Sequence, residues 1–315
     1  MVRIGIDIGG TFLKAGVVTE DGNILATAAR PTGFPRPVED IIKDIAGAAT
    51  DAVAKAGLTL DDVSFVGCGC PGTVNQQTRL IEYAGNLGFK QTPLVGELEK
   101  LLGKPVMAEN DANAAMLGEW KAGAARGTQD CVCITLGTGV GGGVIAGGKM
   151  VRGVNSAGAE LGHTVIDFNG VQCNCGRKGC WEAYASVTAL IRQTQAAMMA
   201  DLDSAMWQLA PTLEEVSGRT AWDAMRAGDE TGKAVVDQYI EYVGVGVVNM
   251  INVFQPEVLC IGGAISKEGD RLLQPLMEKA MIEHYSKYSE KQTKICRCEL
   301  GNDAGIIGAA FLDQV

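Results

Sequence analysis

Short runs of alternating apolar and polar residues at the start of the chain predict a strand meander. The runs are Val2–Asp7, Phe12–Val18 and Ile24–Ala28, and Asp21-Gly22 between the last two is typical of a hairpin turn. From Val38 to Ala56 the apolar residues recur every three or four positions instead, which predicts a helix. The chain is therefore expected to open with three strands and a helix.

Strands and helices then alternate along the rest of the chain. Strands are predicted at Phe65–Cys70, Val106–Ala108, Cys131–Leu136, Val144–Ala146, Val258–Ile261 and Lys294–Glu299. Helices are predicted at Leu94–Leu102, Asp111–Ala122, Thr188–Leu209, Ala234–Asn252, Asp270–Tyr288 and Asp303–Phe311. Each half opens with an apolar strand that runs into a Gly/Thr turn, Asp7–Thr11 and then Leu136–Gly139. We therefore expect an α/β protein that arose by a distant duplication.

Length and composition narrow the class of protein. A chain of 315 residues suggests about two domains, and 47% apolar with 20% charged residues is ordinary for a globular protein. The net charge of −10 argues against a nucleic-acid surface. We expect no signal peptide, because Asp7 interrupts the N-terminal run. We expect no membrane span, because the most apolar later stretch, Ala234–Phe254, carries Asp237 and Glu241. Ten cysteines in such a chain indicate reduced thiols and a cytoplasmic protein.

Two glycine-rich turns have the composition of phosphate clamps. In Asp7–Lys14 the backbone N–H groups and the Thr11 hydroxyl can face a phosphate, and an acid there can hold Mg²⁺. A glycine-rich hairpin without a ligand is the alternative. The second turn, Gly137–Gly143, resembles a dinucleotide fingerprint, and Gly143–Lys149 nearly matches a P-loop, but a strand follows each where those motifs need a helix. Two clamps in one chain favour a nucleotide.

The polar segment Glu109–Asn113 lies between a predicted strand and a predicted helix. One of its residues can cap the helix, which explains one polar position but not four. A carboxylate at this place is suited to act as a general base toward a substrate hydroxyl.

His163 and a cysteine run have the composition of a zinc site. Cys173, Cys175 and Cys180 with His163 supply three thiolates and one imidazole, which satisfy a closed tetrahedral Zn²⁺ site. The pairs Cys68/Cys70, Cys131/Cys133 and Cys296/Cys298 lie in predicted strands, where we interpret them as small buried residues. The other histidine, His284, is interpreted as structural or exposed.

Two acids flank the predicted metal loop. Glu160 precedes His163 by three residues and Glu182 follows Cys180 by two. A rigid loop would fix both carboxylates, which can then accept hydrogen bonds from sugar hydroxyls. Two solvated surface acids are the alternative.

Together these segments resemble the ROK family (repressor, open reading frame, kinase) of sugar kinases, within the actin-like ATPase superfamily. The resemblance covers essentially the whole chain and is closest to the bacterial glucokinase subfamily. It is carried by Asp7–Thr11, Gly69–Gly72, Asn86–Gly88, Glu109–Asn113, Leu136–Gly143, Ala157–His163, Cys173–Glu182 and Ile261–Gly263.

The resemblance implies a role for each matching residue. Asp111 is expected to be the base that takes the proton from the sugar 6-hydroxyl. The sugar is expected to contact Gly72, Asn86, Asn110, Glu160, His163 and Glu182. The Mg-ATP phosphates are expected beside Asp7, Gly10, Thr11, Lys14, Thr138 and Gly139, and the adenosine beside Gly262 and Gly263. His163 is expected both to ligate zinc and to face the sugar.

The implied fold is a duplicated ribonuclease-H-like pair of domains with an interdomain cleft. We expect a small domain at 1–110, a large domain at 111–302, and a C-terminal helix at about 303–315 that packs back on the small domain. The implied function is an ATP-dependent glucose kinase, acting as a homo-oligomer without nucleic acid or membrane partners. The sugar stays open, with N-acetylmannosamine, allose, mannose and fructose as alternatives. So do the phosphate donor and a role as a sugar-sensing regulator, although the chain before Asp7 has no room for a DNA-binding helix-turn-helix.

Overall fold

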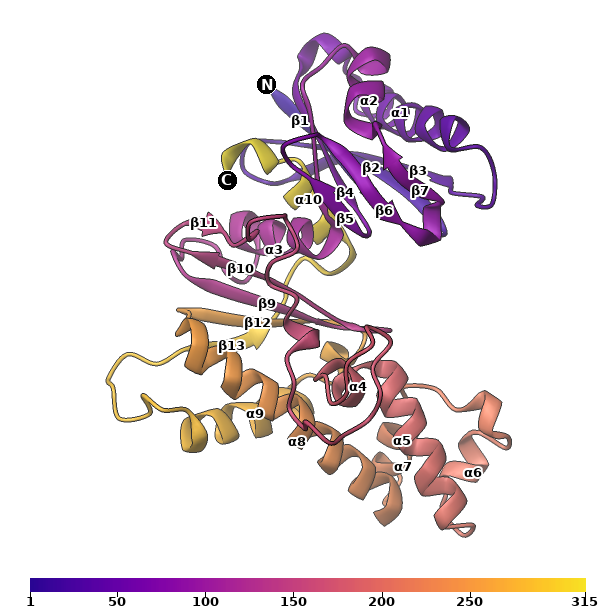
Figure 1. Cartoon of the computed structure of the whole chain (residues 1–315), viewed down its shortest axis with the longest axis vertical. Coiled ribbons are helices and arrows are strands. Elements are labelled where there is room, and N and C mark those ends of the chain that lie inside the picture. The colour runs from indigo at the N-terminus through magenta and orange to yellow at the C-terminus, as the bar shows by residue number, and fades with distance from the viewer. The chain divides into compact units, whose positions relative to one another are not determined.

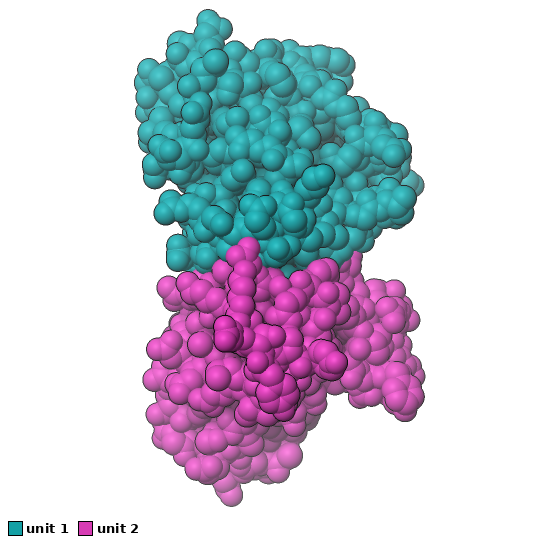
Figure 2. Space-filling view, turned by 90° about the vertical axis from the view of Figure 1, so that its left-hand side faces the viewer, with its two compact units in different colours: residues 1–133, 143–159, 298–315 teal, residues 134–142, 160–297 magenta.

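The computed structural model describes residues 1–315, which divide into two compact units. The first unit comprises residues 1–133, 143–159 and 298–315, and the second comprises 134–142 and 160–297 (Figure 2). The first unit therefore extends past the expected boundary at residue 110 and includes the C-terminal segment.

The first unit is built on a five-stranded sheet with the order β3-β2-β1-β4-β8 (Figure 1). The strands are β1 (Val2–Ile8), β2 (Phe12–Val18), β3 (Ile24–Pro31), β4 (Val63–Cys70) and β8 (Val106–Asn110). β1, β2 and β3 pair antiparallel as the predicted meander, whereas β4 pairs parallel with β1 and β8 parallel with β4. Parallel pairing places the carboxyl ends of β1, β4 and β8 at one edge.

Helices cover both faces of this sheet. α1 (Val38–Lys55) packs on β2 and β3, and α2 (Leu94–Leu102) packs on α1 and β8. On the other face, α10 (Ala304–Ala309) packs on β1 and β4 and against α3 (Asp111–Ala122). The approach of α10 is close because Gly5 and Gly67, which pair across β1 and β4, have no side chains.

Gly67→Ala is expected to destabilise the protein. A methyl group at this position would lie 1.7 Å from the Ala309 carbonyl oxygen, so α10 has to move away from the sheet. We expect a loss of at least about 2 kcal/mol in the free energy of unfolding, measured by urea denaturation. The matched control is Gly96→Ala in α2, where the added methyl would meet nothing beyond the local helix backbone, so stability should rise slightly. Equal stability of Gly67→Ala and the parent would contradict the packing argument.

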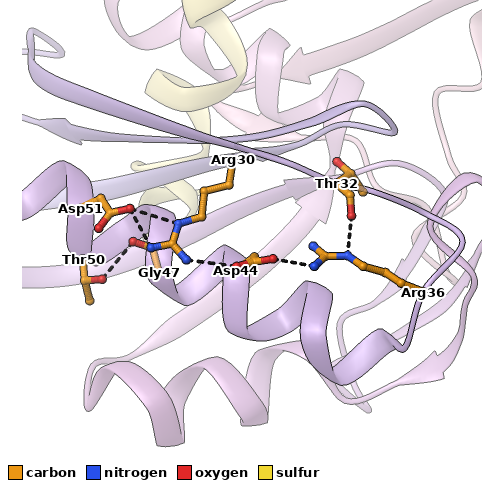
Figure 3. A network of polar contacts seen from close by, with 7 residues as sticks. All are labelled: Arg30, Thr32, Arg36, Asp44, Gly47, Thr50 and Asp51. Atoms are coloured by element: carbon orange, nitrogen blue, oxygen red, sulfur yellow. Dashed lines mark hydrogen bonds and ion pairs between the residues drawn. The ribbon is translucent and has the colours of Figure 1, made fainter.

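Arginine side chains join β3 to α1 (Figure 3). Arg30 donates to Asp51 at 2.8 Å and 3.0 Å and to Asp44 at 3.0 Å. Arg36 pairs with Asp44 at 2.6 Å and donates to the Thr32 carbonyl oxygen at 2.7 Å. The Arg36 guanidinium holds the pKa of Asp44 below its usual value. Because Thr32 follows β3, this network fixes the chain beside the first glycine-rich turn.

A second five-stranded sheet has the order β11-β10-β9-β12-β13. Its strands are β9 (Cys131–Leu136), β10 (Val140–Ala146), β11 (Lys149–Met150), β12 (Val258–Gly263) and β13 (Lys294–Arg297). In both sheets the third, second, first, fourth and fifth strands follow one another across the sheet. The shared order is what the predicted duplication requires.

Most of the helices lie in the second unit. They are α4 (Glu182–Ala185), α5 (Val187–Ala200), α6 (Met206–Leu209), α7 (Thr220–Arg226), α8 (Glu230–Phe254) and α9 (Asp270–Glu283). The predicted helix at Thr188–Leu209 is therefore broken, since residues 201–205 leave the helical path between α5 and α6. The helix predicted to reach Tyr288 ends at Glu283, and His284 adopts extended backbone with a buried side chain.

The sequence did not predict a small additional sheet of the first unit. β5 (Thr73–Asn75), β6 (Leu80–Ala84) and β7 (Phe89–Thr92) form a separate antiparallel sheet. In the whole chain, no helix has both the length and the apolar character needed to cross a bilayer.

Candidate active site

The carboxyl ends of β1, β4 and β8 bring three predicted segments together in the first unit. The register places Asp7 beside Gly69, and Gly69 beside Glu109. The residues that follow, at the turn after β1, the turn after β4 and the start of α3, therefore share one edge of the sheet. This edge is where an open α/β sheet commonly carries its ligands.

Asn110 and Asp111 stand where β8 ends and α3 begins. Asn110 caps the helix, since its Oδ1 accepts from the backbone N–H groups of Ala112 at 2.9 Å and Asn113 at 3.3 Å, and its Nδ2 donates to the Gly72 carbonyl oxygen at 3.1 Å. Asp111 is exposed, and its Oδ1 accepts from the Ala112 N–H at 2.9 Å. Asn110 thus takes the structural role in the motif, and the Asp111 carboxylate reaches the surface from a position that is partly desolvated by surrounding protein.

The electrostatic setting of Asp111 suits proton acceptance. Loss of solvation raises the pKa of Asp111, and hydrogen bonds from the backbone at the start of α3 oppose the shift. Loss of solvation also raises the pKa of Asp7, which Lys14 lowers and the charge of Asp111 raises further. The two carboxylates are therefore electrostatic neighbours, and each is a better base than a fully solvated aspartate.

Thr32 holds the first glycine-rich turn, Gly9–Thr11, through two hydrogen bonds. The Gly9 N–H donates to the Phe12 carbonyl oxygen at 2.9 Å, which closes the turn. The buried Thr32 hydroxyl donates to the Gly9 carbonyl oxygen at 2.6 Å, and its N–H donates to the Thr11 carbonyl oxygen at 2.9 Å. Gly10 and Thr11 are left exposed, as a phosphate clamp requires.

Gly72 and Asn86 border the same edge. Gly72 has φ +89°, and a methyl group there would lie 2.0 Å from the Tyr83 carbonyl oxygen, so only glycine fits the turn after β4. A methyl group on Gly10 would lie 3.4 Å from the Asn86 amide nitrogen. The predicted sugar residues of the first unit are therefore close to its phosphate turn.

In the second unit, the turn between β9 and β10 is the other predicted clamp. It spans Gly137–Gly139 only, because β10 begins at Val140 and takes up the following glycines. The start of α5 holds the turn, since the Val187 N–H donates to the Gly137 carbonyl oxygen and the Thr188 hydroxyl donates to the Thr138 carbonyl oxygen, both at 2.8 Å. Gly263 at the end of β12 packs against the Leu136 carbonyl oxygen. Its φ of +85° and the lack of room for a methyl group both require glycine there.

A cavity of about 580 Å³ lies beside this turn. Its wall includes Val187, whose N–H donates to the Gly137 carbonyl oxygen of this turn, and Ala264, which follows Gly263 in the chain. Its charged lining consists of Arg219, Asp223, Arg226, Lys267, Glu268 and Arg271. Four cations face two anions in a protein of net charge −10, so the cavity is locally cationic. Its volume is within the usual range for a small-molecule site.

The four predicted metal ligands converge in the second unit. The ligand atoms of His163, Cys173, Cys175 and Cys180 all lie within 4.8 Å of one another. Cys175 Sγ and Cys180 Sγ are 3.5 Å apart, and Cys173 Sγ is 3.7 Å from His163 Nδ1. Tetrahedral Zn²⁺ with Zn–S bonds of about 2.3 Å separates its ligand atoms by about 3.8 Å. The donor set and spacing therefore fit zinc.

The loop that carries these ligands is rigidly folded. The Cys173 N–H donates to the Arg177 carbonyl oxygen at 2.8 Å, and Gly179, with φ +75°, lies against the Asp167 carbonyl oxygen. Behind it, the buried Trp181 donates from Nε1 to the Tyr242 carbonyl oxygen at 2.8 Å.

The two acids beside the metal loop differ in their surroundings. Glu182 Oε2 accepts from the Val140 N–H at 2.9 Å, and Oε1 lies 3.9 Å from Cys173 Sγ. Glu182 thus connects the metal loop to the Gly139–Val140 turn. Glu160 is exposed immediately before the short helical turn Leu161–His163.

Sequence reasoning assigned no role to Arg152, which pairs with the buried Glu109 behind Asp111. Glu109 was visible as part of a polar motif. Arg152 carried no local signal, because an isolated arginine in a glycine-rich stretch has no distinctive spacing.

Comparison with known proteins identifies the family. The ROK family model matches residues 3–314. The chain belongs to the ROK family. Among curated relatives, a glucokinase of Thermotoga maritima is 38% identical over 98% of this chain and 96% of its own length. A glucokinase of Streptomyces coelicolor is 39% identical over 99% and 97%.

Solved structures of ROK proteins share the fold. A ROK family glucokinase from Streptomyces griseus, crystallised with glucose and AMPPNP, matches with a TM-score of 0.79 and 36% identity over 99% of both chains. The predicted fold class is confirmed, since the ROK sugar kinases have the actin-like ATPase fold and the two matching sheets are its duplicated core.

Proposed function

We propose that this chain is an ATP-dependent glucose kinase that phosphorylates the 6-hydroxyl of the sugar. The observation that carries the proposal is the Asp111 carboxylate, exposed at the start of α3 with a raised pKa beside a phosphate-type turn. The glucokinases that align with almost the whole chain support glucose as the sugar and ATP as the donor.

Asp111 would accept the proton of the 6-hydroxyl as the new O–P bond forms. Phosphoryl transfer depends mainly on positioning and on neutralising charge, so the remaining residues hold the two substrates. Asp7 would hold Mg²⁺, which neutralises phosphate charge when it is bound. The residues proposed to bind phosphate are Gly10, Thr11 and Lys14 in one glycine-rich turn and Thr138 and Gly139 in the other.

The cationic cavity of the second unit is the proposed adenosine site. It adjoins Gly262 and Gly263, which the family resemblance assigns to adenosine, and its volume accommodates a nucleoside. The residues proposed to bind the sugar are Gly72, Asn86, Asn110, Glu160, His163 and Glu182.

Zinc is proposed as a structural ion at His163, Cys173, Cys175 and Cys180. Four protein ligands fill its coordination, so it has no open position for Lewis-acid chemistry. His163 turns Nδ1 toward the thiolates, which leaves Nε2 on the other edge of the ring for a sugar hydroxyl. The ion would thereby fix the orientation of a sugar-binding residue.

The ten cysteines, which we expect to be reduced thiols, suggest where the protein works. We propose a cytoplasmic homo-oligomer that works in carbohydrate metabolism, with a sugar and ATP as its partners and neither nucleic acid nor a membrane.

An ADP-release assay over a panel of hexoses and N-acetylhexosamines tests the proposal. We expect glucose to have the highest kcat/KM with ATP, and inorganic polyphosphate to be a poorer donor. A higher kcat/KM for N-acetylmannosamine, allose, mannose or fructose would reassign the sugar. Sugar binding without turnover on any member of the panel would favour the sugar-sensing regulator.

A further inference from the structure

A fully buried carboxylate lies directly behind the proposed base. Glu109 is 1% exposed. Its Oε2 accepts from Arg152 Nε at 2.6 Å and from Gln76 Nε2 at 3.3 Å, and its Oε1 accepts from Asn113 Nδ2 at 3.1 Å and from the Asn110 N–H at 3.0 Å. These four hydrogen bonds satisfy the buried carboxylate and hold it in one orientation, because a buried charge without partners would be strongly unfavourable.

Arg152 stands at the neck of a strained loop. The Gly158 N–H donates to the Arg152 carbonyl oxygen at 2.8 Å, so residues 152–158 close on themselves. Ser156 and Ala159 have φ +61° and +60°, a left-handed conformation that such residues adopt only when their surroundings hold them. The chain then runs directly into Glu160, a proposed sugar ligand.

Within residues 143–159, the ion pair between Arg152 and Glu109 ties this loop to the strand end at Asn110 and Asp111. Arg152 reaches Glu109 across 43 positions of sequence. Its guanidinium is mostly covered, with 21% of the side chain exposed. Glu109 is closed off from solvent and Arg152 keeps about a fifth of its side chain exposed, so we argue that the pair acts through the residues it holds.

We propose that Glu109 and Arg152 are positioning residues for the sugar site. Glu109 orients the β8–α3 junction through Asn110 and Asn113, and Arg152 fixes the neck of the 152–158 loop to that junction. The pair thereby sets the sugar-binding geometry without contacting the reacting atoms. This inference rests on the proposed sugar kinase activity.

The test compares Arg152→Met, Glu109→Gln and the double variant with the parent by steady-state kinetics. We expect each single variant to raise the KM for the sugar by on the order of 10- to 100-fold, because small misplacements of binding groups have large effects. We expect kcat to fall much less and the KM for ATP to stay within about twofold of the parent. The double variant should be no worse than the worse single variant, because both changes remove the same contact.

A matched control separates positioning from general stability. Arg3 and Asp313 form a partly buried ion pair in the same unit, at the other end of β1. Arg3→Met and Asp313→Asn should destabilise the fold but leave the sugar KM unchanged. If Arg152→Met fails to fold, Arg152→Lys decides, since it keeps the charge but not the guanidinium geometry and should give an intermediate sugar KM.

The proposal is overturned if a folded Arg152→Met or Arg152→Lys variant keeps the parent's sugar KM, or if the sugar and ATP KM values rise together. Additive effects in the double variant would equally overturn it. The parent enzyme tests the underlying function separately: no turnover by the parent on any sugar refutes the kinase activity, whereas a different preferred sugar only changes the substrate used in this comparison.

Discussion

Replacing Asp111 with asparagine is expected to lower kcat by roughly 10²- to 10⁴-fold, the usual contribution of a general base. The amide has the size of the carboxylate and keeps an oxygen for the Ala112 N–H, so the start of α3 should be unchanged. Sugar binding should survive, because the proposed role of Asp111 is proton acceptance. The measurements are kcat from the ADP-release assay and the sugar dissociation constant from calorimetry.

The pH dependence of the same variant supplies an independent check. Because the pKa of Asp111 is raised in the folded protein, kcat of the parent should fall as the pH decreases through that raised value. The folded state also binds this proton more tightly than the unfolded state, so the parent loses stability as the pH rises from the ordinary pKa through the raised one. Asp111→Asn lacks this loss and should melt at an equal or higher temperature at neutral pH.

Near-parental kcat in Asp111→Asn would remove the base assignment. Asp7→Asn is the informative companion, because Asp7 is the electrostatic neighbour with a raised pKa but has no proposed role in proton transfer. We expect Asp7→Asn to alter the dependence of rate on Mg²⁺ concentration.

Loss of the metal is expected to have the largest effect on folding. Freshly purified protein should contain about one zinc per chain, and Cys175→Ser should lose most of it, because structural zinc sites of this kind contribute on the order of 10 kcal/mol of binding free energy that stabilises the fold. The loop from His163 to Glu182 should become protease-sensitive, and sugar affinity should fall with it. Metal analysis, limited proteolysis and calorimetry measure the three effects.

Cys68→Ala is the matched control for the metal. Cys68 is buried in β4 and lies outside the four-ligand cluster, so its removal should leave the zinc content unchanged. A zinc-free parent, or full zinc retention by Cys175→Ser, would refute the structural metal.

The sequence was most informative where local pattern and local structure coincide. The meander β1–β3 follows from clean alternation around Asp21-Gly22, and α1 follows from its apolar period. The sheet β5–β7 was missed because its strands are short and interrupted by polar residues. Glycines predicted as a turn lie inside β10, where Gly143 leaves room for Met116. Such a choice depends on a neighbour distant in sequence.

The candidate site likewise has parts that the sequence predicts and parts that it does not. Asp7 and Asp111 were singled out by their separate motifs, and the parallel pairing of β1, β4 and β8 then brings them to one edge of the sheet. The zinc ligands could be expected together from donor type and spacing. The pairing of Glu109 with Arg152 could not, because an ion pair between residues 43 positions apart leaves no periodic trace. Long-range polar contacts are the part of a site that local pattern cannot encode.

The placement of α10 has a consequence for biosynthesis. The glycine-lined face of β1 and β4 is covered by a helix that the ribosome makes after the entire second unit. During translation, the face of the first sheet that α10 will cover therefore stays without this helix while residues 160–297 are synthesised and fold. A nascent chain stalled before residue 298 should consequently present a ready binding surface for chaperones that a completed chain lacks.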